Sequence, residues 1–286
     1  AGLLLVTIVA IAALSGPYVS KLIVDDVING GQAGMLGRLV AILIALVIVK
    51  GVCRFFSQVL FETSSQNVLF SMRDTVYRKL LQEDFAFYNK NRTGDLMSRQ
   101  TGDMDAIRHF VAYVVYTVYE NVLYFVFALV MIFATNVKMA LCMVIVLPLT
   151  AFATYSQAKS VRPAFQKCRD AFSSLNTYVQ ENISGNRVVK AFAKEDYEIS
   201  KFTVENDRYR DAELGAANIW KKYVPVFEFF SNALNIILMF VGGVMVVKGE
   251  MTMGDLVATN GYLWMLTVPL RMAGWWVNDI QRFTTS

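Results

Sequence analysis

Six long runs of apolar residues dominate this chain of 286 residues and restrict its fold more than any other feature. Each run has about 18 residues or more, enough for a helix to cross the roughly 30 Å hydrocarbon core of a membrane. A transmembrane β-barrel would instead need short strands of alternating polarity, which are not seen. The sequence therefore predicts an all-α, multi-span membrane protein. The runs cover residues 2–20, 39–61, 110–135, 137–157, 224–247 and 254–276.

The composition agrees with this class. Only 17% of the residues are charged, against about 25% in a typical soluble domain. This balance excludes a disordered chain, an ordinary soluble enzyme and a basic nucleic-acid-binding module, so we expect no nucleic acid as a partner. The three cysteines lie far apart and there is one histidine, so neither a disulfide framework nor a metal site is predicted.

Basic residues are concentrated in two long connections between the runs, residues 62–109 and 158–223. These connections hold nineteen Lys and Arg residues, whereas the three short loops hold four. Cytoplasmic loops carry an excess of Lys and Arg, so both long connections are expected in the cytoplasm. We therefore predict a multi-pass protein of the plasma (inner) membrane.

Both long connections carry helical patterns. Apolar residues recur every three or four positions over residues 69–80, with charges between them. Residues 89–94 have the composition of a turn, and the second connection stays helical past Ala158 before a break at residues 184–186. We expect spans 2 to 5 to continue as helices well beyond the bilayer, forming a cytoplasmic helical stalk that ends in two exposed turns.

The two turns resemble the intracellular loops of ABC exporters. The first motif is FYNKNRTGDLMSR at residues 87–99, followed by Asp103, and the second is ISGNRVVKAF at residues 183–192. Both stand at the places that a six-span exporter layout requires, and that layout covers essentially the whole chain. The motif positions are Thr93, Gly94, Asp95, Arg99, Asp103, Gly185, Arg187, Lys190 and Phe192.

The resemblance implies the transmembrane-domain architecture of ABC exporters and their mechanism. Two such six-helix subunits would form a homo- or heterodimer, and short coupling helices at the turns would dock on ATPase domains. ATP binding and hydrolysis would alternate inward- and outward-facing states and expel a lipophilic small molecule, a lipid or a peptide. The first coupling helix would comprise Phe85, Phe87, Tyr88, Asn89, Lys90, Asn91 and Arg92. The second would lie near residues 194–201 and include Lys194, Glu195, Asp196, Tyr197 and Glu198.

The sequence lacks the motif that binds ATP phosphates. There is no GxxxxGK[ST] loop, and no Gly-Lys dipeptide occurs at all. We therefore expect no catalytic residues and no cofactor in this chain, with ATP and Mg²⁺ held by an ATPase domain outside it. Residues 1–286 are expected to form one transmembrane domain whose first helix is truncated.

Ionisable residues inside the apolar runs suggest a path for substrate, because such residues are costly in lipid and tend to face a wet interior. Arg54, Glu120, Glu228 and Arg271 each lie about 15–19 residues, or roughly 22–29 Å, from the expected outer end of a span. They could line an inward-facing vestibule, or they could form ion pairs that only hold helices together. The candidate lining is Lys50, Arg54, Tyr113, Tyr116, Glu120, Glu228, Asn232, Arg271 and Trp275.

Two other functions remain open at this level. An ion-coupled secondary carrier could use the buried carboxylates Glu120 and Glu228, although such carriers often show broken helices and an internal repeat, which are not seen. A membrane scaffold with a helical interaction surface is the third possibility. The polar residues inside the spans argue against it.

Overall fold

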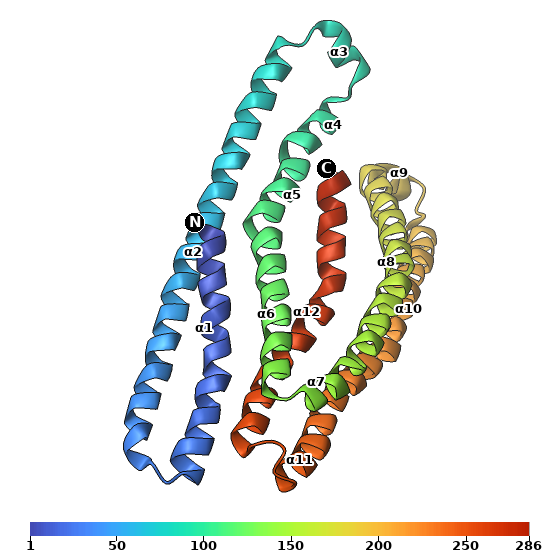
Figure 1. The fold of residues 1–286 in the computed structure, drawn as a ribbon. Helices are drawn as coiled ribbons and strands as arrows, with labels where there is room; N and C mark the ends of the chain where they lie inside the picture. Colours follow the sequence, from blue (N-terminus) through green and yellow to red (C-terminus); the bar gives the residue numbers. More distant parts are fainter. Residues whose placement is uncertain (286) are drawn as a thin grey trace. The chain divides into compact units, whose positions relative to one another are not determined.

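The computed structural model describes the backbone of residues 1–285, and it describes their side chains except those of Phe227, Asn278, Gln281, Arg282 and Thr285. All elements in this described part are helical, as the sequence predicted. The chain divides into two compact units (Figure 1). The first unit comprises residues 1–146 and 233–286, and the second comprises residues 147–232.

The first unit starts with an antiparallel pair of helices. Helix α1 (Gly2–Leu22) continues as a π-helical segment, η1 (Ile23–Asn29). Gly31 then adopts φ +68°, a left-handed conformation that favours glycine, and the chain reverses into α2 (Leu36–Gln82). With 47 residues α2 is about 70 Å long, so the second span does continue far beyond a bilayer core of about 30 Å.

A short helix marks the return from α2. The carboxylate of Asp84 accepts a hydrogen bond of 2.8 Å from the backbone N–H of Phe87 and so caps α3. A short helix was expected near this place, at residues 85–92. The elements between the end of α2 and the next loop are α3 (Phe85–Lys90), α4 (Thr93–Ser98), η3 (Arg99–Asp103), α5 (Met104–His109), η4 (Phe110–Val114) and α6 (Val115–Thr135).

The chain then turns at Asn136, whose side chain accepts a hydrogen bond of 3.1 Å from the N–H of Met139 and caps the next helix. The elements that follow are α7 (Val137–Val144), α8 (Val146–Ser184), α9 (Asn186–Ala191), α10 (Glu195–Ile237), the π-helical η5 (Leu238–Gly242), α11 (Gly243–Val247) and α12 (Met253–Thr285).

The core of the first unit lies where α1, α6 and α12 pack together, with α2 against α1 (Figure 1). A Cβ atom at Gly261 of α12 would lie 2.8 Å from the side chain of Pro17 in α1, so this glycine permits the close approach of the two helices. In lipid such contacts stabilise by dense packing rather than by removal of apolar surface from water. Fully buried side chains here include Val9, Ala128, Ile132, Tyr262, Met265 and Leu266.

A polar cluster joins the end of α1 and η1 to the start of α12. The Asp25 carboxylate accepts hydrogen bonds from the N–H of Gly254 at 2.8 Å and from the hydroxyl of Thr252 at 2.6 Å. Thr252 and Asp255 also form a capping box, in which each side chain accepts from the other's backbone N–H. The Lys21 ammonium lies 2.6 Å from Asp255 and balances its charge.

A second polar cluster joins the loop between α6 and α7 to the loop before α12. The Asn136 side chain donates a hydrogen bond of 3.1 Å to the carbonyl oxygen of Glu250. The Lys138 ammonium lies 2.7 Å from the Glu250 carboxylate. These two contacts therefore hold the α6–α7 loop and the start of α7 against the loop before α12.

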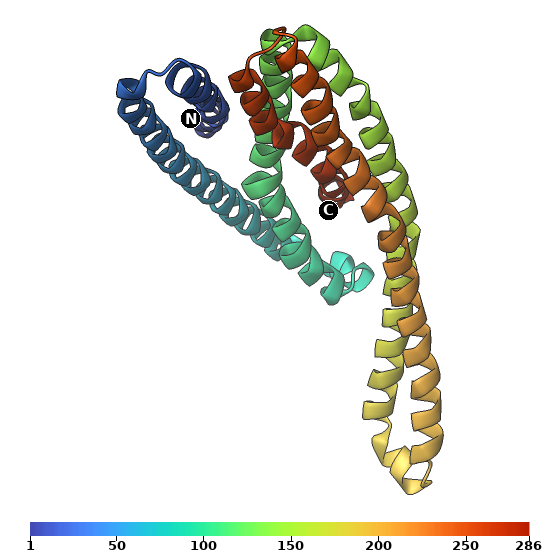
Figure 2. The ribbon, with the colours of Figure 1, turned by 90° about the horizontal axis from the view of Figure 1, so that it is seen from below.

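The second unit is an antiparallel pair formed by most of α8 and α10, which run side by side and meet at α9 (Figures 1 and 2). The Tyr223 hydroxyl lies 2.9 Å from that of Ser160 and 3.3 Å from that of Ser156, and the rings of Phe172 and Tyr209 are 5.4 Å apart. These contacts set the register of the pair. The predicted break after Ser184 is confirmed, because α8 ends there.

Five helical stretches of the described chain are long and apolar enough to cross a membrane. They contain the first five predicted spans. The sixth predicted span, residues 254–276, is helical as expected within α12, but it falls outside these five. The polar residues Asp255, Asn260 and Arg271 lower its hydropathy, so its crossing of the membrane stays a prediction.

Candidate functional site

A buried ion pair lies between α2 and α6 in the first unit. The guanidinium of Arg54 is 3.3 Å from the carboxylate of Glu120. Glu120 is only 5% exposed, and its other oxygen accepts a hydrogen bond of 2.7 Å from the hydroxyl of Tyr124, one turn along α6. A carboxylate in lipid is costly unless it is paired, and here both of its oxygens have partners. Arg54 is partly exposed, so the pair has a buried anionic end and an accessible cationic end.

The surroundings of this pair are aromatic and polar. The rings of Phe61 and Tyr116 lie 5.3 Å apart, and Tyr116 packs edge-on against Tyr113 at 5.7 Å. A void of about 10 Å³ adjoins the pair, room for about one water molecule. Its lining consists of Val6, Val9, Arg54, Ser57, Gln58, Tyr116 and Glu120.

The structure brings together part of the predicted lining. Arg54, Tyr116 and Glu120 lie around one void, and Tyr113 contacts Tyr116. Lys50 is partly exposed on the same helix as Arg54. Arg271 and Trp275 are exposed on α12 and do not line this void.

Glu228 and Asn232 are exposed on α10, where the Asn232 side chain donates a hydrogen bond of 2.9 Å to the carbonyl oxygen of Glu228. These two residues belong to the second unit. A single vestibule that includes them with the other lining residues stays a prediction.

Four residues of the void were not among the predicted site residues. Ser57 and Gln58 follow Arg54 by three and four positions on α2, so the helical spacing could have indicated them. Val6 and Val9 come from α1, and an apolar residue in an apolar run gives no signal of a site.

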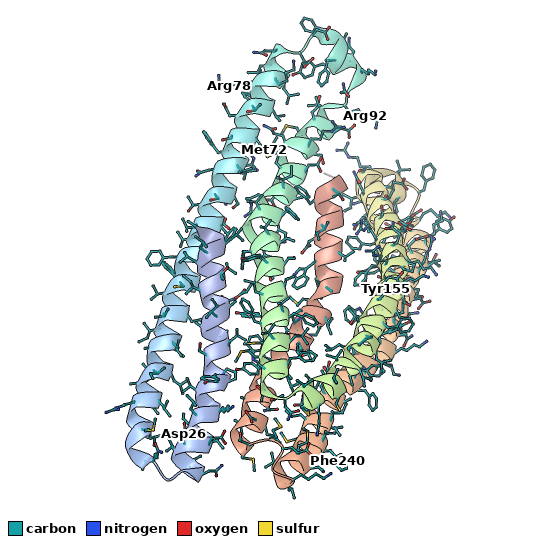
Figure 3. The ribbon with its side chains drawn as sticks, viewed as in Figure 1. Asp26, Met72, Arg78, Arg92, Tyr155 and Phe240 are labelled. Carbon is teal, nitrogen blue, oxygen red and sulfur yellow. The ribbon has the colours of Figure 1, made fainter. Side chains whose placement is uncertain are left out.

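The tip between α2 and α4 carries the first predicted coupling residues, and Figure 3 labels Arg92 there and Arg78 on the last turns of α2. Phe85 of α3 is 90% exposed. Tyr88 is tied back to α2, because its hydroxyl donates a hydrogen bond of 2.6 Å to the carbonyl oxygen of Leu80. Phe87 is partly buried and packs edge-on against Tyr88 at 5.5 Å. The tip thus presents one free aromatic side chain on a braced helix.

The remaining predicted residues of this loop are either exposed or lie at the ends of helices. Asn89, Lys90 and Arg92 are exposed, and the Asn91 side chain donates a hydrogen bond of 3.0 Å to the carbonyl oxygen of Phe87. Thr93, Gly94 and Asp95 begin α4, while Arg99 and Asp103 begin and end η3.

At the tip between α8 and α10, the place of the second coupling helix stays a prediction. The short helix here is α9, Asn186–Ala191, whereas residues 195–201, most of the stretch where the second coupling helix was expected, form the start of the long helix α10. The reason is local: Ala193 adopts φ +46°, and this residue ends the turn that separates α9 from α10. Gly185 precedes α9, and Arg187 and Lys190 lie within it.

Exposed aromatic side chains also mark this second tip. Phe192 is 71% exposed, and Tyr197 is exposed beneath the Lys201 ammonium, 4.5 Å from its ring centre. Lys190 lies 3.4 Å from Glu195, and the Tyr178 hydroxyl of α8 donates a hydrogen bond to the Glu198 carboxylate. Lys194 and Asp196 are exposed. The contact of Lys190 joins α9 to α10 and that of Tyr178 joins α8 to α10, so together they brace the tip.

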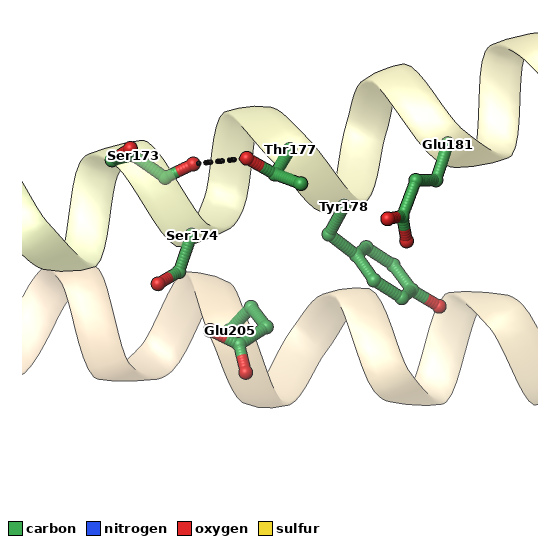
Figure 4. A pocket seen from close by; sticks show the side chains of 6 residues that line it. All are labelled: Ser173, Ser174, Thr177, Tyr178, Glu181 and Glu205. Carbon is green, nitrogen blue, oxygen red and sulfur yellow. Dashed lines mark hydrogen bonds between the residues drawn. The ribbon is translucent and has the colours of Figure 1, made fainter.

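A polar depression of about 340 Å³ lies along the helix pair below this tip (Figure 4). Its lining is Ser173, Ser174, Thr177, Tyr178, Glu181 and Glu205. None of the predicted substrate residues contributes to it. An open, polar surface of this kind does not suit a lipophilic molecule.

Comparison with known proteins decides the family. A family model described as ABC transporter transmembrane region matches residues 1–270. The chain belongs to this family. The resemblance drawn from the two loop motifs is therefore confirmed, as is the fold class of an ABC exporter transmembrane domain.

Relatives of this ABC transporter domain include exporters. The chain is 33% identical over 262 residues to the uncharacterized ABC transporter ATP-binding protein YknU of Bacillus subtilis, covering 92% of this chain and 45% of that protein. It is 29% identical to an ATP-dependent lipid A-core flippase of Syntrophus aciditrophicus, covering 89% of this chain and 42% of the flippase. It is 28% identical to the multidrug resistance-like ATP-binding protein MdlA of Escherichia coli, covering 97% and 48%. The chain thus spans less than half the length of these relatives.

Proposed function

We propose that this domain is the substrate-translocating membrane part of an ATP-driven exporter. It works by alternating access and is coupled to ATPase domains through the tips at α3 and α9. The observation that carries the proposal is that both helical connections extend far from the apolar segments and end in short helices, with the exposed Phe85 in α3 and the exposed Phe192 directly after α9. The family match and the ATP-dependent relatives support it.

The tips have the features of a docking surface. Phe85 and Phe192 are free to enter pockets on a partner, and charged residues around them would orient the contact. Phe85, Phe87, Tyr88, Asn89, Lys90, Asn91 and Arg92 are the proposed contact residues of the first tip. For the second tip we propose α9 and Phe192, together with Lys194 and the first residues of α10, Glu195, Asp196, Tyr197 and Glu198.

The long helices supply the mechanical link. A helix of 47 residues such as α2 transmits a displacement along about 70 Å because its backbone hydrogen bonds are internal and it bends little. Movement of an ATPase domain against a tip would then shift the helix faces near Arg54 and Glu120. The partners proposed are a second six-helix subunit, ATPase domains and membrane lipid.

The substrate proposed is a lipophilic small molecule, a lipid or a peptide. The partly exposed guanidinium of Arg54 beside Tyr113 and Tyr116 offers a charge and aromatic faces to an amphipathic molecule. The names of two relatives, a lipid A-core flippase and a multidrug resistance-like protein, support this class. ATP and Mg²⁺ would be held by the ATPase domains, so the complete protein would be an ATP-hydrolysing translocase of the inner membrane with both tips in the cytoplasm.

The test is reconstitution of this domain together with its ATPase domains in liposomes. We expect a lipophilic dye or lipid to stimulate ATP hydrolysis several-fold, and we expect its movement across the bilayer to require ATP. Movement that persists without nucleotide and follows a pH gradient would instead support a secondary carrier. No movement and no stimulation across a panel of lipophilic compounds would favour a scaffold.

A further inference from the structure

The pair formed by α8 and α10 carries four cationic side chains at one level. The hydrogen bonds between the Tyr223 hydroxyl and those of Ser156 and Ser160 place this turn of α10 beside residues 156–160 of α8. Arg162 follows Lys159 by three residues, a rise of about 4.5 Å along the helix, and Lys221 and Lys222 directly precede Tyr223. All four side chains are exposed. We call Lys159, Arg162, Lys221 and Lys222 the basic collar.

Acidic side chains are absent from the collar's own stretch of sequence. No Asp or Glu occurs from Leu147 to Arg169, or from Leu214 to Phe227. Farther along α10 the cations are paired instead, Arg208 with Glu205 and Arg210 with Asp207. Among the described residues none of the four collar cations lies in an ion pair. Anions from outside the chain would therefore relieve the repulsion among these four like charges.

The collar lies where each helix leaves its apolar segment. On α8, residues 147–158 carry no charge before Lys159, and on α10 the only charged residue from 223 to 237 is Glu228, about 9 Å along the helix from Lys222. The aromatic side chains of Tyr155 and Trp220, both exposed, flank the collar. Trp and Tyr at the end of an apolar segment are typical of the boundary between lipid chains and headgroups.

Two prolines mark the same level. Pro163 and Pro225 lie inside α8 and α10, and a proline has no N–H to donate to the carbonyl four residues earlier. The carbonyls affected are those of Lys159 and Lys221, two residues of the collar. A backbone carbonyl without its helical donor is tolerated at a membrane protein's surface where water or other donors reach it, as in the headgroup layer, and is costly among lipid chains.

We propose that the basic collar binds the phosphate groups of anionic phospholipids in the headgroup layer. The partner is defined by charge and position: it is anionic, it lies at the edge of the hydrocarbon, and it can reach cations on both helices at once. Each Lys or Arg held near an anionic lipid surface strengthens binding about fivefold. The function proposed above does not require this site, and this site does not require ATP.

The test measures lipid binding by the complete protein, with its ATPase domains, in detergent. Native mass spectrometry would compare retention of phosphatidylglycerol with that of phosphatidylcholine. We expect Lys221→Gln with Lys222→Gln to weaken retention of phosphatidylglycerol about 10-fold or more, with phosphatidylcholine unchanged. The matched control is Lys201→Gln with Arg210→Gln, which removes the same charge from exposed positions nearer the tip of the same helix and should change retention less than twofold.

Further arms separate the remaining explanations. The variant Lys221→Arg with Lys222→Arg should retain phosphatidylglycerol as well as the original protein does, because charge rather than shape is required. In the original protein, 0.5 M salt should weaken the retention of phosphatidylglycerol. Equal losses in the collar variant and the control, or no loss in either, would overturn the proposal. Displacement of the lipid by millimolar inorganic phosphate would assign the collar to free anions. Loss of ATPase-domain or subunit association with lipid retention unchanged would assign it to a protein partner and likewise overturn the lipid assignment.

Discussion

The carboxylate of Asp25 accepts a hydrogen bond of 2.8 Å from the backbone N–H of Gly254, so the end of the first helical stretch caps the last helix of the chain. The two residues are 229 positions apart. There is no room for a side chain at Gly254, because a Cβ atom would lie 2.5 Å from the Asp25 carboxylate and 2.6 Å from the carbonyl oxygen of Lys21. Close packing and polar capping therefore depend on each other at this end of α1 and α12.

We expect Gly254→Ala to lower the stability of the purified protein by about 1–3 kcal/mol, because the added methyl group forces the Asp25 cap away from α12. Thermal unfolding in detergent would measure it. The matched control is Gly274→Ala in the same helix, where a Cβ atom meets nothing within 4 Å. Alanine is the better helix former, so the control should be neutral or slightly stabilising. Equal effects of the two substitutions would contradict the cap.

The pairing of Arg54 with Glu120 can be measured by a double-mutant cycle. We expect Arg54→Gln and Glu120→Gln each to destabilise the protein, and the double variant to lose less than the sum, by about 1 kcal/mol because Arg54 is partly exposed. A glutamine at position 120 can still accept the hydrogen bond from Tyr124, so the cycle isolates the ion pair. Additive losses would show that the two charges do not interact.

The ion pair of Lys138 with Glu250 should make stability depend on pH. The hydrogen bond and charge of the Lys138 ammonium hold the pKa of Glu250 below its ordinary value of 4.5. A lowered carboxyl pKa stabilises the folded state above the unfolded-state pKa, and this contribution is lost as pH falls through the folded-state pKa. Glu250→Gln should therefore lower the melting temperature at pH 7, and the difference from the original protein should shrink below about pH 4.5. A difference that stays constant down to pH 3 would rule out this linkage.

Phe192 gives a test of coupling that is separate from stability. Its side chain is 71% exposed, so Phe192→Ala should change the free energy of unfolding by less than about 0.5 kcal/mol. If it fills a pocket on an ATPase domain, the variant should lose most of the substrate-stimulated ATP hydrolysis of the complete protein. Phe165→Ala, an exposed aromatic on α8 about 20 residues before the turn at α9, is the control and should retain stimulation. Full stimulation in Phe192→Ala would remove this residue from the coupling surface.

Much of the helical framework could be predicted from the sequence, because helices depend on local spacing and composition. The first five apolar runs lie in long helices, and the break after Ser184 follows from a Ser-Gly-Asn turn. The short helix α3 has a local cause too, the Asp84 cap three residues before Phe87. The second short helix, α9, begins about eight residues before the stretch where a coupling helix was expected, and the turn with the positive φ of Ala193 separates it from α10.

The sequence by itself thus determined a multi-span helical protein with long extensions, two loop motifs and a set of charges inside apolar segments. Only the tertiary structure decided which of those charges meet. Arg54 and Glu120 are 66 residues apart, and Asp25 and Gly254 are 229 apart. Local periodicity fixes the face on which a residue lies, whereas its partner depends on how distant helices pack, rotate and slide against one another. That choice is made by side-chain packing across the whole unit, and no short stretch of sequence records it.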